Sequence, residues 1–229
     1  MPRKILRIWL ACFALAIIAT PLTVWSQSGD PPAPRVRITT NLGEFVIELD
    51  RERAPLTVDN FLAYVRAGHY TGTLFHRVIA NFVIQGGGVT LDYRAKPANK
   101  PIANESGNGL RNLRGTVGLA RAASPHSGDA QFYVNIVDNA ELDPLATRWG
   151  YAVFGRVVEG MEVVDRISNV PTGANAALKQ DAPLKPVVIE KAAIVGAAPG
   201  ESLAPPPEAG APDAAAPEAA PPATPLTAN

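Results

Sequence analysis

The chain has 229 residues and carries 21 basic and 21 acidic side chains, so its formal net charge is zero, which argues against a general nucleic-acid binder. A single cysteine excludes an intramolecular disulfide framework and any multi-cysteine zinc or iron–sulfur site. With 47% hydrophobic residues a buried core can form, whereas 22 prolines, roughly twice the usual share of about 5%, indicate a loop-rich fold or segments outside it.

Residues 1–26 have the pattern of an export signal. Arg3, Lys4 and Arg7 give a cationic start, and residues 8–25 carry no charge. No A-x-A sequence precedes the expected cleavage site, and an uncharged stretch of about 18 residues is near the lower limit for spanning a bilayer. We therefore predict a signal peptide, with an uncleaved membrane anchor as the alternative.

Two further segments are predicted to lie outside the folded domain. Residues 27–34 (QSGDPPAP) form a short linker, and residues 196–229 form a tail. From position 199 onward the tail contains nine prolines and ten alanines in 31 residues, with no aromatic and no basic residue. Such a segment cannot bury enough apolar surface to offset the entropy of ordering, so we expect a disordered tail. One domain remains, residues 35–195.

The domain is predicted to begin with two strands and a helix. Apolar and polar residues alternate over 36–39 and 45–49, as in half-buried strands separated by a turn. A helix follows, with Thr57 as its N-cap and Gly68 as its stop. Three apolar residues would form its buried face: Phe61, Leu62 and Val65.

The rest of the domain is predicted to consist mainly of short strands. They span residues 74–79, 82–85, 116–120, 131–137, 151–158 and 186–195. Residues 89–114 lack periodicity and form a long surface excursion, and residues 160–168 form a second helix. Many short strands with two helices favour an antiparallel barrel over a βαβ sheet.

The common catalytic constellations lack essential parts. The three histidines show no His-x-x-x-His spacing, so we predict no metal site. No Gly-x-Ser-x-Gly elbow is present, and the glycines at 86–88 are not followed by the Gly-Lys-Ser/Thr of a phosphate loop. We therefore predict no cofactor.

Arg77 is the unusual residue of the central region. It lies inside an apolar segment, where an arginine is costly unless its guanidinium reaches a cleft or a partner. An edge-strand arginine that faces solvent is the alternative.

Several motifs surround Arg77 in a characteristic order. They are FHRVI at 75–79, F-x-x-Q-G-G-G at 82–88, VGLARA at 117–122, QFYVN at 131–135, Leu142-Asp143, and YAVFGRVVEGM at 151–161. Together they resemble the cyclophilin family of peptidyl-prolyl cis–trans isomerases, over nearly all of residues 35–195, and most closely its exported, periplasmic bacterial branch. The resemblance implies a mainly β fold: a closed eight-stranded antiparallel β-barrel capped by two α-helices.

The resemblance also implies a mechanism. The peptide bond has a rotational barrier of about 18–20 kcal/mol because of its partial double-bond character. Twisting an X–Pro bond leaves a lone pair on the prolyl nitrogen, and a fixed cationic donor stabilises the twisted state over the planar one. The implied catalytic residues are Arg77, Phe82 and Gln85. The implied substrate-binding residues are Val83, Ala120, Arg121, Ala122, Gln131, Tyr133, Leu142 and Tyr151.

Four positions depart from the eukaryotic pattern of the family. Val83 stands in place of a methionine, Tyr133 of a phenylalanine, Glu141 of a tryptophan and Tyr151 of a histidine. The tryptophan is associated with cyclosporin binding, so we expect weak cyclosporin affinity. Arg77 is retained, so isomerase activity is expected.

The resulting hypothesis is a monomeric, periplasmic isomerase (rotamase) that assists protein folding. Its partners would be proline-containing polypeptides, with no nucleic acid, and a membrane only if the N-terminal segment is retained as an anchor in the inner membrane. Two other functions stay open: a proline-binding module or chaperone, and a tethered envelope component with the tail as a spacer.

Overall fold

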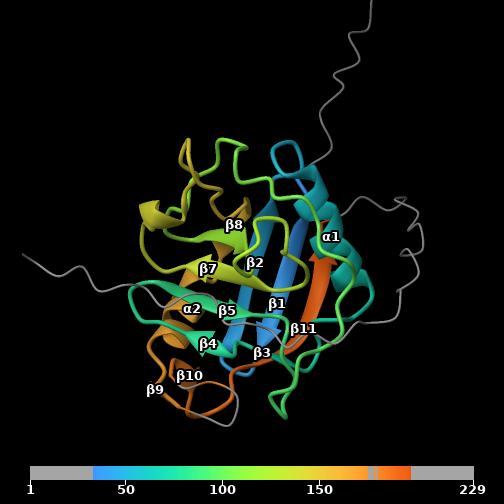
Figure 1. The fold of residues 1–229 in the computed structure, drawn as a ribbon. Helices are drawn as coiled ribbons and strands as arrows, with labels where there is room; N and C mark the ends of the chain where they lie inside the picture. Colours follow the sequence, from blue (N-terminus) through green and yellow to red (C-terminus); the bar gives the residue numbers. More distant parts are fainter. Residues whose placement is uncertain (1–32, 175–177, 179, 197–229) are drawn as a thin grey trace, which may run out of the picture. The chain divides into compact units, whose positions relative to one another are not determined.

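Alternating side chains from residue 35 onward build a strongly curved sheet with a helix on either side of it (Figure 1). The computed structural model describes residues 33–174, 178 and 180–196. The predicted signal segment, nearly all of the linker and nearly all of the tail lie outside these residues. Among the described residues, no helix has the length and apolarity needed to cross a membrane.

The described strands and helices, in chain order, have the following bounds: β1 (Arg35–Thr40), β2 (Gly43–Leu49), α1 (Pro55–Arg66), β3 (Thr73–Leu74), β4 (Arg77–Val78), β5 (Val83–Gly86), β6 (Thr116–Leu119), β7 (Phe132–Asn135), the 3₁₀ turn η1 (Ala140–Leu142), β8 (Val153–Glu159), α2 (Met161–Ser168), β9 (Thr172–Gly173), β10 (Ala182–Pro183) and β11 (Val188–Val195).

The main sheet has nine strands in the order β3-β11-β1-β2-β8-β6-β7-β5-β4, and β9 and β10 form a separate ladder. The prediction of a mainly β fold with two helices is confirmed, but that of a closed eight-stranded barrel is wrong. The two edge strands, β3 and β4, are only two residues long and are not paired with each other. The predicted strand at 74–79 is divided by Phe75 and His76, so no continuous ladder closes the sheet.

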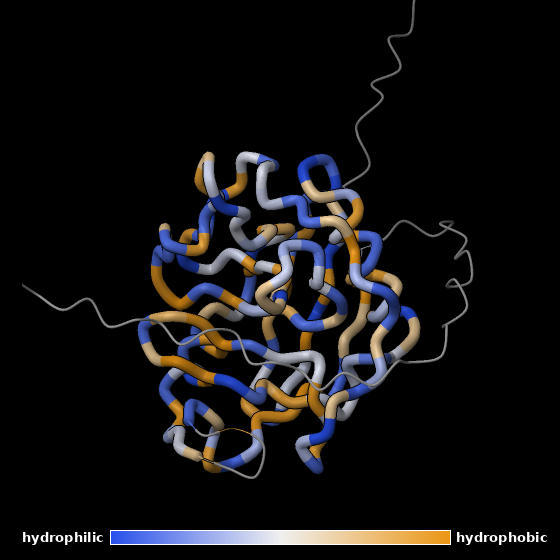
Figure 2. Tube along the Cα trace, viewed as in Figure 1, coloured by the Kyte–Doolittle hydropathy of each residue, from blue (hydrophilic) through white to orange (hydrophobic). Residues whose placement is uncertain are grey.

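The main core lies on the concave side of the sheet, where aromatic rings gather around Phe61 of α1. Its ring centroid lies 5.2 Å from Tyr70, 5.5 Å from Phe132 and 5.1 Å from Phe154. All four rings are buried. Apolar and polar positions interleave along several strands (Figure 2). On β1, for example, exposed and buried residues alternate, so one set of side chains faces this core and the other faces outward.

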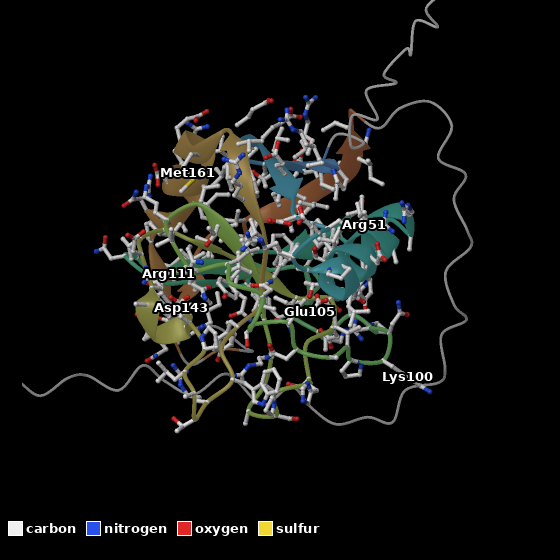
Figure 3. The ribbon with its side chains drawn as sticks, turned by 90° about the horizontal axis from the view of Figure 1, so that it is seen from above. Arg51, Lys100, Glu105, Arg111, Asp143 and Met161 are labelled. Atoms are coloured by element: carbon white, nitrogen blue, oxygen red, sulfur yellow. The ribbon has the colours of Figure 1, made fainter. Side chains whose placement is uncertain are left out.

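Helix α1 begins differently from the prediction. Its first residue is Pro55, and Thr57 lies inside the helix rather than at its N-cap. The Glu105 carboxylate, on the long excursion, accepts hydrogen bonds from the Leu56 N–H at 3.1 Å and from the Thr57 N–H at 2.8 Å (Figure 3). A negative charge at a helix N-terminus satisfies free N–H groups and interacts favourably with the helix dipole. A residue 48 positions away therefore caps the helix.

Candidate active site

Arg77 lies on edge strand β4 and is held by a chain of two glutamines. Antiparallel pairing places it opposite Gln85 of β5. The Arg77 Nη1 donates to Gln85 Oε1 at 3.4 Å, and Gln85 Nε2 donates to Gln131 Oε1 at 3.0 Å. The amide of Gln85 is thereby oriented with its oxygen toward the guanidinium.

Arg77 is half-buried and has no carboxylate within 4 Å among the residues of the described ranges. Burial lowers the pKa of its guanidinium, while Asp181 and Tyr151 act in the opposite direction. An arginine side chain nevertheless stays protonated in proteins. Arg77 is therefore a desolvated cation that no carboxylate of the described residues neutralises through an ion pair, unlike the solvent-facing arginine of the alternative interpretation.

Beside Arg77 lies a second apolar cluster, separate from the main core, which we call the outer cluster. Val83, Ala120 and Tyr133 are its buried members. Three partly buried side chains pack against them: Phe82, Leu142 and Tyr151. All six are residues that the family resemblance implied for the site, so the structure brings these predicted residues together.

The two-residue period of the strands separates the outer cluster from the core. On β5, Ile84 belongs to the main core, whereas Val83 belongs to the outer cluster. On β7, Phe132 and Val134 belong to the main core, whereas Tyr133 belongs to the outer cluster. Because Gln85 shares the face of Val83, the polar group that contacts Arg77 lies on the same side of the sheet as the apolar cluster.

The Tyr133 hydroxyl is satisfied by a buried polar network that sequence analysis missed. Tyr133 Oη donates to Asn112 Oδ1 at 2.6 Å. The side chain and main chain of Asn112 donate to Asp143 Oδ1 at 3.0 and 2.8 Å. Asn135 Nδ2 donates to Asn112 Oδ1 at 3.2 Å, and Asn139 Nδ2 donates to Asn135 Oδ1 at 2.7 Å.

This network connects Tyr133 with other parts of the outer cluster. Asn139 Nδ2 also donates to the main-chain oxygen of Phe82 at 3.0 Å. Asp143, which directly follows Leu142, is further paired with Arg111 at 3.1 Å (Figure 3). Asn112 lies in the excursion, where no hydrophobic periodicity marks it, so the sequence alone offers no signal for this network.

Gly118 makes room for the Tyr133 ring. A Cβ atom at this position would lie 2.2 Å from both Tyr133 Cζ and Oη. We expect Gly118→Ala to displace the ring, to lower the free energy of unfolding by about 2 kcal/mol, within the range of overpacked cores, and to raise KM for X–Pro peptides several-fold. Denaturant unfolding and steady-state kinetics measure the two effects.

The matched control is Gly107→Ala, because no atom lies within 4 Å of a Cβ built at Gly107. Its unfolding free energy should stay within about 0.5 kcal/mol of the wild type. An equal loss of stability in the two variants would contradict the steric explanation.

Arg121 and Ala122 lie at the rim rather than in the outer cluster. The Arg121 guanidinium stacks over the Tyr151 ring at 4.3 Å from its centroid. Its Nη1 donates to the main-chain oxygen of Ala122 at 2.9 Å. Within the described part of the chain, the main-chain N–H and C=O of Arg121 take part in no hydrogen bond. These two groups can therefore pair with an extended peptide.

His76 is buried beside Arg77, and its Nδ1 has no hydrogen-bond partner in the described ranges. Burial lowers the pKa of His76 to about 4; the main chain of Leu74 opposes this shift and the charge of Arg77 adds to it. The imidazole is therefore neutral at pH 7. Among the described residues, the geometry gives this histidine no hydrogen bond with the groups of the candidate site.

His76 should make the fold sensitive to acid. In the unfolded chain its pKa is about 6.5, so its contribution to stability is complete above pH 6.5 and is lost as the pH falls toward 4. From pH 7 to pH 5 this residue should lower the free energy of unfolding by about 2 kcal/mol, at 1.4 kcal/mol for each unit. Denaturant unfolding at pH 7 and pH 5 measures this loss. In His76→Leu, the drop in unfolding free energy between the two pH values should be about 2 kcal/mol smaller than in the wild type. Parallel pH dependence in the two proteins would contradict this assignment.

No group of three or more His, Cys, Asp or Glu residues that could hold a metal ion occurs in the part of the chain that the structure describes. What the assembled groups offer is a desolvated cation beside an apolar surface, with free main-chain groups at the rim. Such a site can hold an apolar ring and direct hydrogen-bond donors at an atom next to it.

Comparison with known proteins gives the same family throughout. The family model "Cyclophilin type peptidyl-prolyl cis-trans isomerase/CLD" matches residues 35–194. The chain is 54% identical over 164 residues to peptidyl-prolyl cis-trans isomerase cyp18 of Streptomyces antibioticus, covering 70% of this chain and 98% of that protein. It is 46% identical over 185 residues to peptidyl-prolyl cis-trans isomerase A of Dickeya dadantii, covering 78% of this chain and 97% of that protein.

A solved structure is also similar. The crystal structure of a cyclophilin type peptidyl-prolyl cis-trans isomerase of Cryptosporidium parvum matches with a TM-score of 0.58 and 26% sequence identity. The match covers 71% of this chain and 97% of that one. A second structure of the same protein, in the presence of the dipeptide Ala-Pro, gives a TM-score of 0.57 at 27% identity.

Proposed function

The chain belongs to the cyclophilin-type peptidyl-prolyl cis-trans isomerases, and on that basis we propose that Arg77 drives the isomerisation of X–Pro bonds in exported proteins. Family membership supplies the reaction and the class of substrate, which is a proline-containing polypeptide. The roles of individual residues and the place of action are our proposals.

In the proposed mechanism, the outer cluster binds the proline ring. The ring would contact four of its side chains: Phe82, Val83, Tyr133 and Leu142. Burying the ring removes apolar surface from water and fixes one side of the peptide bond. The free main-chain groups of Arg121 hold the residue before the proline, so the bond between the two held parts can twist. Ala120 and Ala122 line the path of the chain.

Arg77 then stabilises the twisted state. When the bond leaves planarity, the prolyl nitrogen loses its amide resonance and becomes a hydrogen-bond acceptor. A guanidinium N–H directed at this nitrogen interacts weakly with the planar bond and strongly with the twisted bond, and this difference lowers the barrier. Gln85 and Gln131 orient the guanidinium. No proton transfer and no covalent intermediate are needed.

The observation that carries the proposal is the position of a half-buried arginine without a carboxylate partner in the described ranges, next to an apolar cluster outside the core. A module that only binds proline has no need of such a cation. The direct test is a protease-coupled or exchange-NMR assay of cis–trans interconversion in an X–Pro peptide. Interconversion no faster than the uncatalysed rate would contradict the proposal.

We propose export to the periplasm on separate grounds, namely the cationic and apolar segment at residues 1–26. Fractionation of cells followed by mass analysis of the N-terminus distinguishes a cleaved signal peptide from an uncleaved membrane anchor. A cleaved chain in the periplasmic fraction supports the signal peptide, and a full-length chain in the membrane fraction supports the anchor. A full-length chain in the cytosolic fraction would contradict both.

A further inference from the structure

The loop at residues 144–149 joins two members of the outer cluster, Leu142 and Tyr151, and carries two exposed apolar side chains. Leu145 is 61% exposed and Trp149 is 46% exposed. Together with Ser106, both line a hollow of about 400 Å³. This volume lies within the range of pockets that bind small ligands, about 300–1,000 Å³.

The loop is held in place by hydrogen bonds to main-chain oxygens and by an edge-on contact between the Trp149 and His126 rings, whose centroids lie 5.1 Å apart. Arg148 Nη2 donates to the main-chain oxygens of Glu141 at 2.7 Å and Asp143 at 3.2 Å. Leu145 and Arg148 exchange two main-chain hydrogen bonds of 2.9 and 3.1 Å. The apolar surface is therefore presented on a preorganised backbone, which reduces the entropy cost of binding.

Arg121 connects this loop to the proposed proline site. Its Nη2 donates to the main-chain oxygen of Trp149 at 3.0 Å, and its guanidinium also stacks over Tyr151. Gly150, which follows Trp149, donates its N–H to Ser106 Oγ at 3.1 Å, and Ser106 lines the hollow. The hollow and the proline site thus share a wall, and one residue contacts both.

Single exposed leucines are common on protein surfaces. Here a leucine and a tryptophan share one short fixed loop and line one hollow, and tryptophan is among the residues that most often dominate binding energy. A polypeptide that places its proline in the outer cluster must continue past the wall of the site, at about 3.3 Å for each extended residue. Its neighbouring side chains therefore come within reach of the hollow.

We infer that the 144–149 loop forms a subsite for one bulky apolar side chain of the client polypeptide, outside the X–Pro pair itself. This inference rests on the proposed function, because it requires the client's proline to lie in the outer cluster. The subsite would give the enzyme a preference for prolines that have a large apolar residue nearby, as in segments that become buried when a client folds.

The test uses a peptide series in which proline is flanked by alanines, and one phenylalanine is moved through the positions on both sides of the X–Pro pair. In the wild-type protein we expect one position to lower KM about tenfold relative to the all-alanine peptide, with kcat unchanged. The double variant Leu145→Ser, Trp149→Ser should lose this advantage and retain kcat/KM for the all-alanine peptide within twofold. Leu91→Ser, which alters a leucine that is 55% exposed on another loop, is the matched control and should keep the advantage.

A second readout follows binding directly. The indole N–H resonance of Trp149, assigned by its loss in Trp149→Phe, should shift with the phenylalanine peptide and not with the all-alanine peptide. The inference would be overturned if the double variant still showed a lower KM for the phenylalanine peptide than for the all-alanine peptide. It would also be overturned if the wild type showed no such difference in KM. Failure of the proposed function gives a different result, because the wild type would then not isomerise the all-alanine peptide.

Discussion

Replacing Arg77 with alanine is expected to lower kcat/KM for X–Pro isomerisation at least tenfold while leaving the fold intact. Tenfold corresponds to about 1.4 kcal/mol of transition-state stabilisation, near the lower end of the 1.5–3 kcal/mol typical of a hydrogen bond to a charged group. The fold should tolerate the change because Arg77 is only half-buried and its side-chain hydrogen bond to Gln85, the only one it makes within the described residues, is 3.4 Å long. An exchange-NMR assay at several enzyme concentrations gives the rate, and circular dichroism verifies the fold.

The matched control is Arg37→Ala, another strand arginine, whose exposed side chain lies 3.7 Å from the Glu44 carboxylate. It removes the same charge and length of side chain and should leave kcat/KM within twofold of the wild type. If Arg77→Ala isomerises as fast as Arg37→Ala, the proposed role of Arg77 is wrong even though the chain is an isomerase.

Replacing Asn112 with leucine is expected to cause the largest loss of stability among the site variants, about 4 kcal/mol. Asn112 is 1% exposed, and its side chain pairs with Tyr133, Asn135 and Asp143. Each buried polar group left without a partner costs about 1–3 kcal/mol. Because two of these partners adjoin or belong to the outer cluster, KM for X–Pro peptides should also rise. Denaturant unfolding and steady-state kinetics give both quantities.

The combination of Asn112→Leu with Tyr133→Phe separates this network from general damage to the core. Removing the Tyr133 hydroxyl abolishes one unpaired group, so the double variant should regain part of the stability and part of the lost affinity. Asn169→Leu is the control, since Asn169 is exposed and its amide donates to the main-chain oxygen of Asp165 at 2.7 Å. Additive losses in the double variant would contradict the coupling of Asn112 to Tyr133.

The alternation of side chains made much of the domain predictable. Strand β5, strand β7 and both helices lie where periodicity placed them, because each buries one regular face. The cyclophilin motifs named the residues of the outer cluster and of the glutamine chain. Val83, Gln85 and Tyr133 lie on strands, where a fixed period makes sequence position equivalent to position on a face. The other residues of the outer cluster lie in loops or in η1, and only the family motifs indicated them.

The features that escaped prediction depend on contacts between distant segments. Glu105 caps α1 and Asn112 supports Tyr133, yet both lie in the aperiodic excursion, where sequence offers no register. The open edge of the sheet was missed for a related reason. Whether two-residue strands such as β3 and β4 pair with each other depends on the path of the segment between them, and local composition does not encode it.

The division of β5 and β7 into a core-facing set and an outward-facing set has an evolutionary consequence. Residues such as Ile84 and Val134 belong to the main core, whereas their direct neighbours Val83 and Tyr133 belong to the outer cluster, the proposed site for proline. Selection for a new client preference can therefore act on the outward-facing set, within the limits that the buried partners of Tyr133 impose, while selection for stability maintains the core-facing set. When the client proteins of a lineage change, substitutions at outward-facing positions such as Val83 can therefore alter the proposed proline site without changing the residues of the main core.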